Sequence, residues 1–217
     1  MISFKNVSKR YPDGYVALNN IDLSVEPGEM VFLTGHSGAG KSTLLKLIAA
    51  IERPTSGTIT ISGQNIAQLK LGAIPYLRRK IGFIFQDHKL LFDRNVFDNV
   101  LLPLQIGSFE NHMMVSRVRA ALDKVGLLKK EKSMPIALSG GERQRLCIAR
   151  AVVHRPSILI ADEPTGNLDV DYARDIMAMF TSFNQVGVTV LIATHDASLL
   201  EDTQHRVLSL KQGKLAA

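Results

Sequence analysis

The stretch Gly35-His36-Ser37-Gly38-Ala39-Gly40-Lys41-Ser42 decides the fold of this chain, because it matches the phosphate-binding loop G-x-x-x-x-G-K-[ST]. The apolar run at 30–34 precedes it and predicts a buried strand, and residues 42–50 predict a helix that begins with Ser42 and Thr43. In this order the glycines let backbone N–H groups point at an anion, and the helix N-terminus adds the positive end of its dipole. We expect Lys41 to reach the β- and γ-phosphates and the Ser42 hydroxyl to bind Mg²⁺. The sequence therefore predicts a nucleoside triphosphate site.

Composition sets wide limits on what the chain can be. Its 217 residues are enough for one domain with a real core, and no apolar run approaches the roughly 20 residues that a membrane helix needs. The first residues lack the apolar region of a secretory signal, and the single cysteine, Cys147, excludes an internal disulfide and fits a reducing cytoplasm. The net charge of +6 favours an anionic partner, which could be nucleotide, nucleic acid or an acidic membrane face. Charge alone does not choose among them.

Hydrophobic periodicity divides the chain into strand-rich and helical parts. Strands are expected at 2–7, 16–25, 57–63, 81–85, 157–161 and 188–193, with a turn at 11–14 and a closing hairpin at 207–215. Residues 87–153 have a helical pattern, clearest at 116–125 and 140–153, and another helix is expected at 172–183. The apolar strands at 157–161 and 188–193 are typical of a parallel sheet that is buried on both faces. We therefore predict an α/β nucleotide-binding core with a β-rich flank and a helical insertion.

Two acids, Asp162 and Glu163, follow the apolar run 158–161. Ligands bind at the carboxyl ends of strands in open parallel sheets, so both side chains are expected at the nucleotide site. Asp162 can hold Mg²⁺ directly or through water, and Glu163 is then free to polarise an attacking water. The alternative, that these acids only begin a turn before Pro164, is less favoured in a chain that also has a phosphate-binding loop.

The segment Leu138-Ser139-Gly140-Gly141-Glu142 has two compatible interpretations. Ser139 and Glu142 have the spacing of a helix capping box. A capped helix that starts with two glycines also offers backbone donors and a serine hydroxyl to a phosphate. Alone the motif is weak, but its position between the phosphate-binding loop and the acidic strand makes it nearly diagnostic.

With these motifs the chain resembles the ATP-binding cassette (ABC) ATPases over essentially all of its 217 residues. The resemblance implies a P-loop fold with a mostly parallel core sheet, an antiparallel β subdomain and a helical subdomain. It implies one ABC ATPase domain over 1–217, with a RecA-like core and β subdomain at 1–86 and 154–217 and the helical subdomain at about 87–153. In this family the segment 138–142 is the signature motif, which completes the ATP site of a second subunit. The resemblance thus implies Mg²⁺-dependent ATP hydrolysis in a head-to-tail homodimer, with ATP between the loop of one copy and Ser139, Gly140, Gly141 and Glu142 of the other.

The resemblance also assigns roles to residues that the motifs above leave out. Gln86 matches the glutamine that contacts the metal and the water, and His195 matches the histidine that contacts the γ-phosphate. Residues 167–169 match the loop at the dimer seam. Tyr11 stands where the family places an aromatic ring on adenine, although Tyr15 lies close and is an alternative. His36 lies inside the loop at a variable position, so no chemistry is assigned to its side chain. The expected catalytic residues are Glu163, His195 and Gln86, and the expected metal ligands are Ser42, Gln86 and Asp162.

Within the family, three stretches (34–41, 85–91 and 161–169) resemble the bacterial cell-division ATPases, with His36 and the pair Asp87-His88 as the more particular features. This implies an FtsX-like integral membrane partner, association with divisome proteins, a peripheral position on the cytoplasmic face of the inner membrane, and activation of septal peptidoglycan hydrolysis. A lipoprotein-release or efflux ATPase is the alternative. A third class, cassettes that act on nucleic acid or the ribosome, fits the basic charge. Such proteins usually have two cassettes or a coiled-coil insertion, and this chain has neither, so no nucleic-acid partner is expected.

Overall fold

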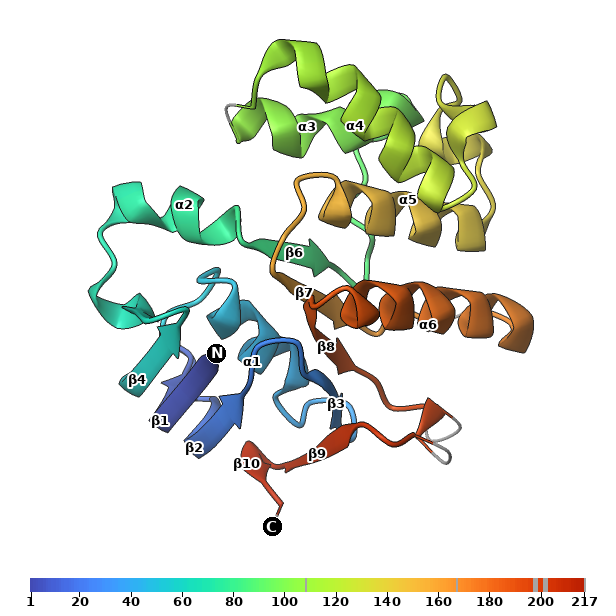
Figure 1. Ribbon diagram of the computed structural model, residues 1–217. Coiled ribbons are helices and arrows are strands. Elements are labelled where there is room, and N and C mark those ends of the chain that lie inside the picture. Colours follow the sequence, from blue (N-terminus) through green and yellow to red (C-terminus); the bar gives the residue numbers. More distant parts are fainter. Residues whose placement is uncertain (108, 167, 197–198, 201–202, 217) are drawn as a thin grey trace.

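The computed structural model describes residues 1–107, 109–166, 168–196, 199–200 and 203–216. Two sheets form the lower part of the molecule, and a group of helices lies at one end of the larger sheet (Figure 1). The smaller sheet is antiparallel, with the order β2-β1-β4-β5. Its strands are β1 (Ile2–Arg10), β2 (Val16–Val25), β4 (Ser56–Ile61) and β5 (Gln64–Asn65). It corresponds to the expected β-rich flank.

The larger sheet has the order β10-β9-β3-β8-β7-β6. Every neighbouring pair from β9 to β6 is parallel, and only β10 runs antiparallel to its neighbour β9. The strands are β3 (Met30–Thr34), β6 (Ile81–Ile84), β7 (Ile158–Asp162), β8 (Thr189–Ala193), β9 (Arg206–Lys211) and β10 (Lys214–Leu215). All residues of β7 and β8 are buried, which is why their sequences are continuous apolar runs and do not alternate. The predicted α/β fold with a mostly parallel core sheet is confirmed.

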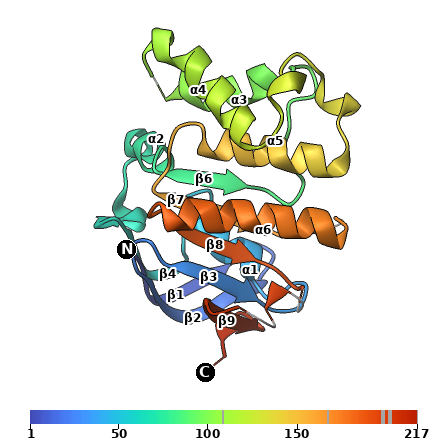
Figure 2. The ribbon, with the colours of Figure 1, turned by 45° about the vertical axis from the view of Figure 1, so that its right-hand side comes forward.

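Each face of the larger sheet has its own apolar core. On one face, α1 (Lys41–Ile48) and the antiparallel sheet pack against the strands through residues such as Leu45, Ile59 and Ile160. On the other face, Phe32, Leu159 and Ile192 pack with side chains of the helical part, including Leu146, and with Phe180 of α6 (Val170–Gln185). The sheet therefore lies between two apolar layers, and the carboxyl ends of its strands are left to form a site (Figure 2).

The helical part contains α3 (Val96–Ile106), α4 (Asn111–Lys124) and α5 (Gly140–Val152). In Figure 1, α3 and α4 lie above α5, and α5 lies between them and the sheet. The C-terminal turn of α5 is in close contact with β6, because a Cβ atom at Gly82 would lie 2.3 Å from the carbonyl oxygen of Ala151. The helical part thus shares a core with the sheet, and its separation as a subdomain at about 87–153 remains a proposal.

Most of the predicted elements are present with small shifts of their ends. The predicted helix at 116–125 begins earlier, at Asn111, and the one at 172–183 extends to 170–185. Two helices were not predicted individually. The helix α3 contains Pro103 in its interior, and α2 (Ile74–Arg78) is one short turn after β5. Both lack the long amphipathic repeat that identifies a helix in a sequence. None of the helices in the described ranges is long and apolar enough to cross a membrane.

Candidate nucleotide site

The phosphate-binding loop forms one wall of a cleft of about 440 Å³ at the carboxyl ends of the parallel strands. The cleft brings together residues from five separate stretches of the sequence. Its lining consists of Tyr15, the loop and helix residues His36, Ser37, Gly38, Ala39, Gly40, Lys41, Ser42 and Thr43, and then Gln86, Glu163 and His195. The strand, loop and helix order that the sequence predicted places these groups at one edge of the sheet.

The loop requires glycine at two of its positions. Gly35 has a φ of 147°, and a Cβ atom there would lie 2.3 Å from the carbonyl oxygen of Leu210. Gly40 has a φ of 108°, and its Cβ would lie 2.5 Å from the carbonyl oxygen of Ala17. Backbone from β9 and β2 therefore packs directly against the loop, and only glycine fits at these two places.

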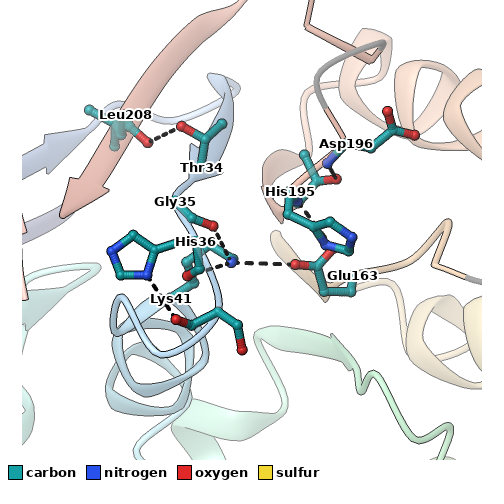
Figure 3. Close-up of polar contacts among 10 residues, drawn as sticks. Thr34, Gly35, His36, Lys41, Glu163, His195, Asp196 and Leu208 are labelled. Carbon is teal, nitrogen blue, oxygen red and sulfur yellow. Dashed lines mark hydrogen bonds and ion pairs between the residues drawn. The ribbon is translucent and has the colours of Figure 1, made fainter. Parts of the chain in front are cut away.

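Lys41 lies inside the loop with only 7% of its surface exposed. Its Nζ donates hydrogen bonds to the carbonyl oxygens of Gly35 at 2.6 Å and His36 at 3.5 Å, and it lies 3.5 Å from Oε1 of Glu163 (Figure 3). Carbonyl oxygens and one carboxylate hold this buried ammonium in position. The arrangement places a fixed cation between the loop and the acidic strand.

Glu163 lies directly after β7 in the left-handed region, with a φ of 51°. This conformation is uncommon for a residue with a side chain, and it directs the carboxylate across the cleft. Oε2 accepts a hydrogen bond from the backbone N–H of His195 at 3.3 Å and lies 2.8 Å from Nδ1 of the His195 ring. Figure 3 shows the same carboxylate between Lys41 and His195. One carboxylate thus links the loop lysine to the histidine that follows β8.

Asp162, the last residue of β7, is buried next to Ser42. The Ser42 side chain is a close neighbour, and burial raises the pKa of the Asp162 carboxyl above its usual value. Within the described part of the chain its Oδ1 has no hydrogen-bond partner. A buried carboxylate oxygen without a partner is costly unless a cation or another donor satisfies it. Hydroxyl and carboxylate oxygens are the ligands that Mg²⁺ takes, so these two residues fit that ion, and Gln86 lines the same cleft.

The segment 138–142 lies away from this cleft. Ser139 caps α5: its Oγ accepts from the N–H of Glu142 at 3.2 Å, while Oε2 of Glu142 accepts from the N–H of Ser139 at 3.0 Å. The other carboxylate oxygen of Glu142 lies 2.5 Å from Nζ of Lys130. The predicted capping box is therefore present, and Ser139 and Gly140 are exposed at the surface. Within one chain the structure does not bring this segment to the phosphate-binding loop.

Comparison with known proteins adds an independent line of support. The model of the ABC transporter family matches residues 18–166. The Cell division ATP-binding protein FtsE of Escherichia coli (strain K12) is 57% identical over 215 residues, covering 99% of this chain and 97% of that protein. The protein of the same name from Bacillus subtilis (strain 168) is 44% identical, with coverage of 98% and 93%. Among solved structures, a dimeric post-hydrolysis state of the ATP-binding cassette MJ0796 with ADP and Pi has a TM-score of 0.92 at 34% identity, covering 100% and 97% of the two chains.

The chain belongs to the ABC transporter family. As a member of this family it binds and hydrolyses ATP. The cbiO1 protein of Clostridium perfringens, described as part of the ABC transporter complex cbiONQ, has the same fold, with a TM-score of 0.87 at 30% identity over 100% of this chain and 86% of that one. The similarity covers the whole cassette, so the cleft and the exposed signature segment are two parts of one family fold.

The aromatic residue of this cassette that lines the cleft is Tyr15. Its hydroxyl donates to the carbonyl oxygen of Gly38 at 2.7 Å, and its ring is half exposed. Tyr11 is not among the lining residues; its ring lies nearly parallel to that of Tyr15 at 6.5 Å, and its hydroxyl is 3.3 Å from Oγ1 of Thr43. Both rings are near the loop, so which of them stacks on adenine stays a prediction, and the geometry favours Tyr15.

Sequence reasoning missed how the remaining motif residues are held. Asp169 caps α6 by accepting from the N–H of Tyr172 at 3.0 Å. Asn167, the first residue of the same predicted loop, lies outside the described residues. The ring of Tyr172 in turn contacts the signature, since a Cβ atom at Gly141 would lie 2.9 Å from it. The capping signal of Asp169 was readable in the sequence, whereas the contact between Tyr172 and Gly141 required the fold.

Proposed function

We propose that this ATPase is the cytoplasmic subunit of a bacterial cell-division ABC complex and that it acts with an FtsX-like integral membrane protein. Similarity to the FtsE relatives over nearly the whole of both chains carries this proposal. The complex would use ATP binding and hydrolysis to activate septal peptidoglycan hydrolysis, in association with divisome proteins. The chain would lie on the inner face of the inner membrane, held there by its partner. A lipoprotein-release or efflux role for the same ATPase is the alternative.

The proposed chemistry assigns one task to each group in the cleft. Lys41 and the backbone N–H groups from Gly35 to Thr43 bind the phosphates, and Tyr15 or Tyr11 packs on adenine. Ser42, Asp162 and Gln86 hold Mg²⁺, which supplies positive charge at the phosphates when it is bound. Glu163 polarises the attacking water, and His195 contacts the γ-phosphate. The carboxylate of Glu163, held by His195 and near Lys41, supports this assignment because a base must be fixed close to its water.

A homodimer completes the site in this proposal. The exposed Ser139 and Gly140, at the start of a capped helix, would bind the ATP held by the loop of the second copy, together with Gly141 and Glu142 in the first turn of α5. The dimeric MJ0796 cassette with ADP and Pi supports this arrangement. ATP would then stabilise the dimer, and its hydrolysis would release the two copies.

We further propose that the membrane partner docks near residues 86–100. Four charged side chains of this surface are exposed, namely Asp87, Lys89, Asp93 and Arg94. Beside them lies a groove of about 480 Å³ that includes Phe83, Phe85, Pro103 and Ile106. An apolar groove with a charged rim is suited to a helix of a partner protein. Substitution of Asp93 and Arg94 is expected to weaken partner binding and to leave ATP binding intact.

Capture of the partner tests the proposal directly. Glu163→Gln, which should retain ATP and the dimer, is incubated with ATP and detergent-solubilised membranes, and the bound membrane proteins are identified. A protein with few membrane spans and a large extracytoplasmic domain, together with division proteins, is the expected result. Lys41→Ala is the matched control, because it should not hold the ATP-bound form. Recovery of a lipoprotein-release or efflux permease in place of that protein would move the same chemistry into transport.

A further inference from the structure

The two residues that follow the turn after Gln86 have an unusual backbone. His88 and Lys89 both lie in the left-handed region, with φ values of 60° and 46°. For residues with side chains this conformation costs about 1–2 kcal/mol each, so two in succession require contacts that impose them. His88 is not among the residues that line the nucleotide cleft.

Those contacts come from one face of α5. Nη1 of Arg150 donates to the carbonyl oxygen of Lys89 at 2.7 Å, and Nη2 donates to that of His88 at 2.5 Å. The Sγ of Cys147 lies 3.4 Å from the same His88 oxygen. The side chain of Gln144 lies next to the ring of His88. Residues spaced by three lie on the same side of a helix, so 144, 147 and 150 form a continuous strip against this segment.

Arg150 is the central residue of this contact. Its side chain is half-buried, and this burial lowers the pKa of the guanidinium. In the described ranges it makes no ion pair with a carboxylate, and its guanidinium donates hydrogen bonds to the two carbonyl oxygens. A buried charge is tolerated only where its donors are satisfied, so the side chain and the two left-handed residues specify each other's positions.

The same helix carries the signature segment at its other end. Ser139 caps α5, and Arg150 lies eleven residues later, about 16 Å along the axis at 1.5 Å per residue. An α-helix of this length behaves as a rigid rod on the scale of these contacts. A shift of the signature end is therefore passed to His88 and Lys89, two and three residues after Gln86.

We propose that Gln144, Cys147 and Arg150 fix the segment after Gln86 to the signature helix, so that Arg150 is a positioning residue that acts through Gln86. This inference rests on the proposed role of Gln86 at the metal and the water. When the second copy docks against Ser139 and Gly140 of one chain, α5 of that chain then sets the position of Gln86 in its own cleft. Each site thus responds to occupation of the other through one helix.

Steady-state ATPase assays of Arg150→Met, Gln86→Ala and the double variant test this inference. Methionine retains the length of the side chain and removes both hydrogen bonds. We expect kcat to fall about tenfold or more, because a small misplacement of a positioned group has effects of this size, while KM and the affinity for a fluorescent ATP analogue change less than about twofold. The double variant is expected to be no slower than Gln86→Ala alone, because residues that act through one another are not additive.

Arg119→Met is the matched control. Arg119 also makes two hydrogen bonds in the helical part, to Glu131 at 3.0 and 3.2 Å, and neither bond involves the segment after Gln86. Its kcat should equal that of the wild type. Full additivity in the double variant, or a loss of Tm in Arg150→Met with unchanged kcat per folded molecule, would overturn the proposal and leave Arg150 as a stabilising residue only. Absence of ATPase activity in the wild type would instead count against the proposed function.

Discussion

The phosphate-binding loop and the signature segment both start a helix and both present glycines, but they differ in what surrounds them. The loop is enclosed by its own chain: Lys41 is buried, Leu210 and Ala17 pack against its glycines, and Glu163 faces it. The signature satisfies only its own helix cap and leaves Ser139 and Gly140 exposed. The proposed homodimer would use this difference, because ligand held by the loop of one copy could reach the exposed signature of the other.

The largest expected effect is on the enclosed half. Glu163→Gln keeps the size of the side chain and removes its basicity. We expect kcat to fall by about 10²–10⁴-fold, the contribution of a positioned general base, while ATP still binds. Single-turnover hydrolysis and size-exclusion chromatography with ATP and Mg²⁺ measure the two consequences. The variant should elute as a dimer with ATP, and turnover at the wild-type rate would exclude Glu163 as the base.

A mixing experiment separates the two halves of the site. Lys41→Ala removes the buried cation and should weaken ATP binding by about 100-fold, as for loss of a charge-assisted contact. Gly140→Asp should retain the fold, since a Cβ there meets no atom within 4 Å and an acid in the first turn of a helix is favourable. Its carboxylate would repel a phosphate that belongs to the second copy. Each variant alone should therefore lack ATPase activity.

Mixed in equal amounts, the two variants should regain activity. In a mixed dimer, the intact loop of the Gly140→Asp chain faces the intact signature of the Lys41→Ala chain, so one complete site forms. ATPase rate against mixing ratio measures this, and it should be highest near equal amounts. A mixture that stays as inactive as its components, with both variants folded and Gly140→Asp still binding ATP, would mean that the exposed signature does not complete a site in this way.

The comparison also explains which parts were predictable from the sequence. Lys41, Asp162 and Glu163 could be placed because a buried strand that ends in a loop fixes where its next residue lies. The capping box at Ser139 was readable for the same reason, since it depends on a local spacing. The hydrogen bonds from Arg150 to residues 88 and 89 could not be predicted from the sequence. They join segments that lie 61 and 62 residues apart, and their acceptors are backbone oxygens, which any residue has. Likewise, Tyr11 and Tyr15 are too close in sequence for spacing to decide between them.

The smallest expected effect concerns stability. Burial raises the pKa of Asp162, so this carboxyl favours the folded state fully only below its unfolded pKa, and that contribution is lost as the pH rises through the folded pKa. Asp162→Asn should therefore raise the Tm at pH 7 in the presence of a chelator, at about 2–4 °C for each kcal/mol in a chain of this size. The gain should shrink as the pH falls toward 4. Asp175→Asn, at an exposed position of α6, should show no such difference.

Addition of Mg²⁺ and ATP should reverse the order of the two proteins. The buried Oδ1 of Asp162 has no hydrogen-bond partner in the described part of the chain, and a cation there would satisfy it. Ligand binding to the folded form raises Tm, so the wild type should gain more than Asp162→Asn from the same additions. Differential scanning fluorimetry with and without Mg²⁺ at fixed ATP measures both slopes. An equal Mg²⁺ response would remove Asp162 from the metal site. Ser42 and Lys41 would then be the neighbours that offset the burial of its carboxylate.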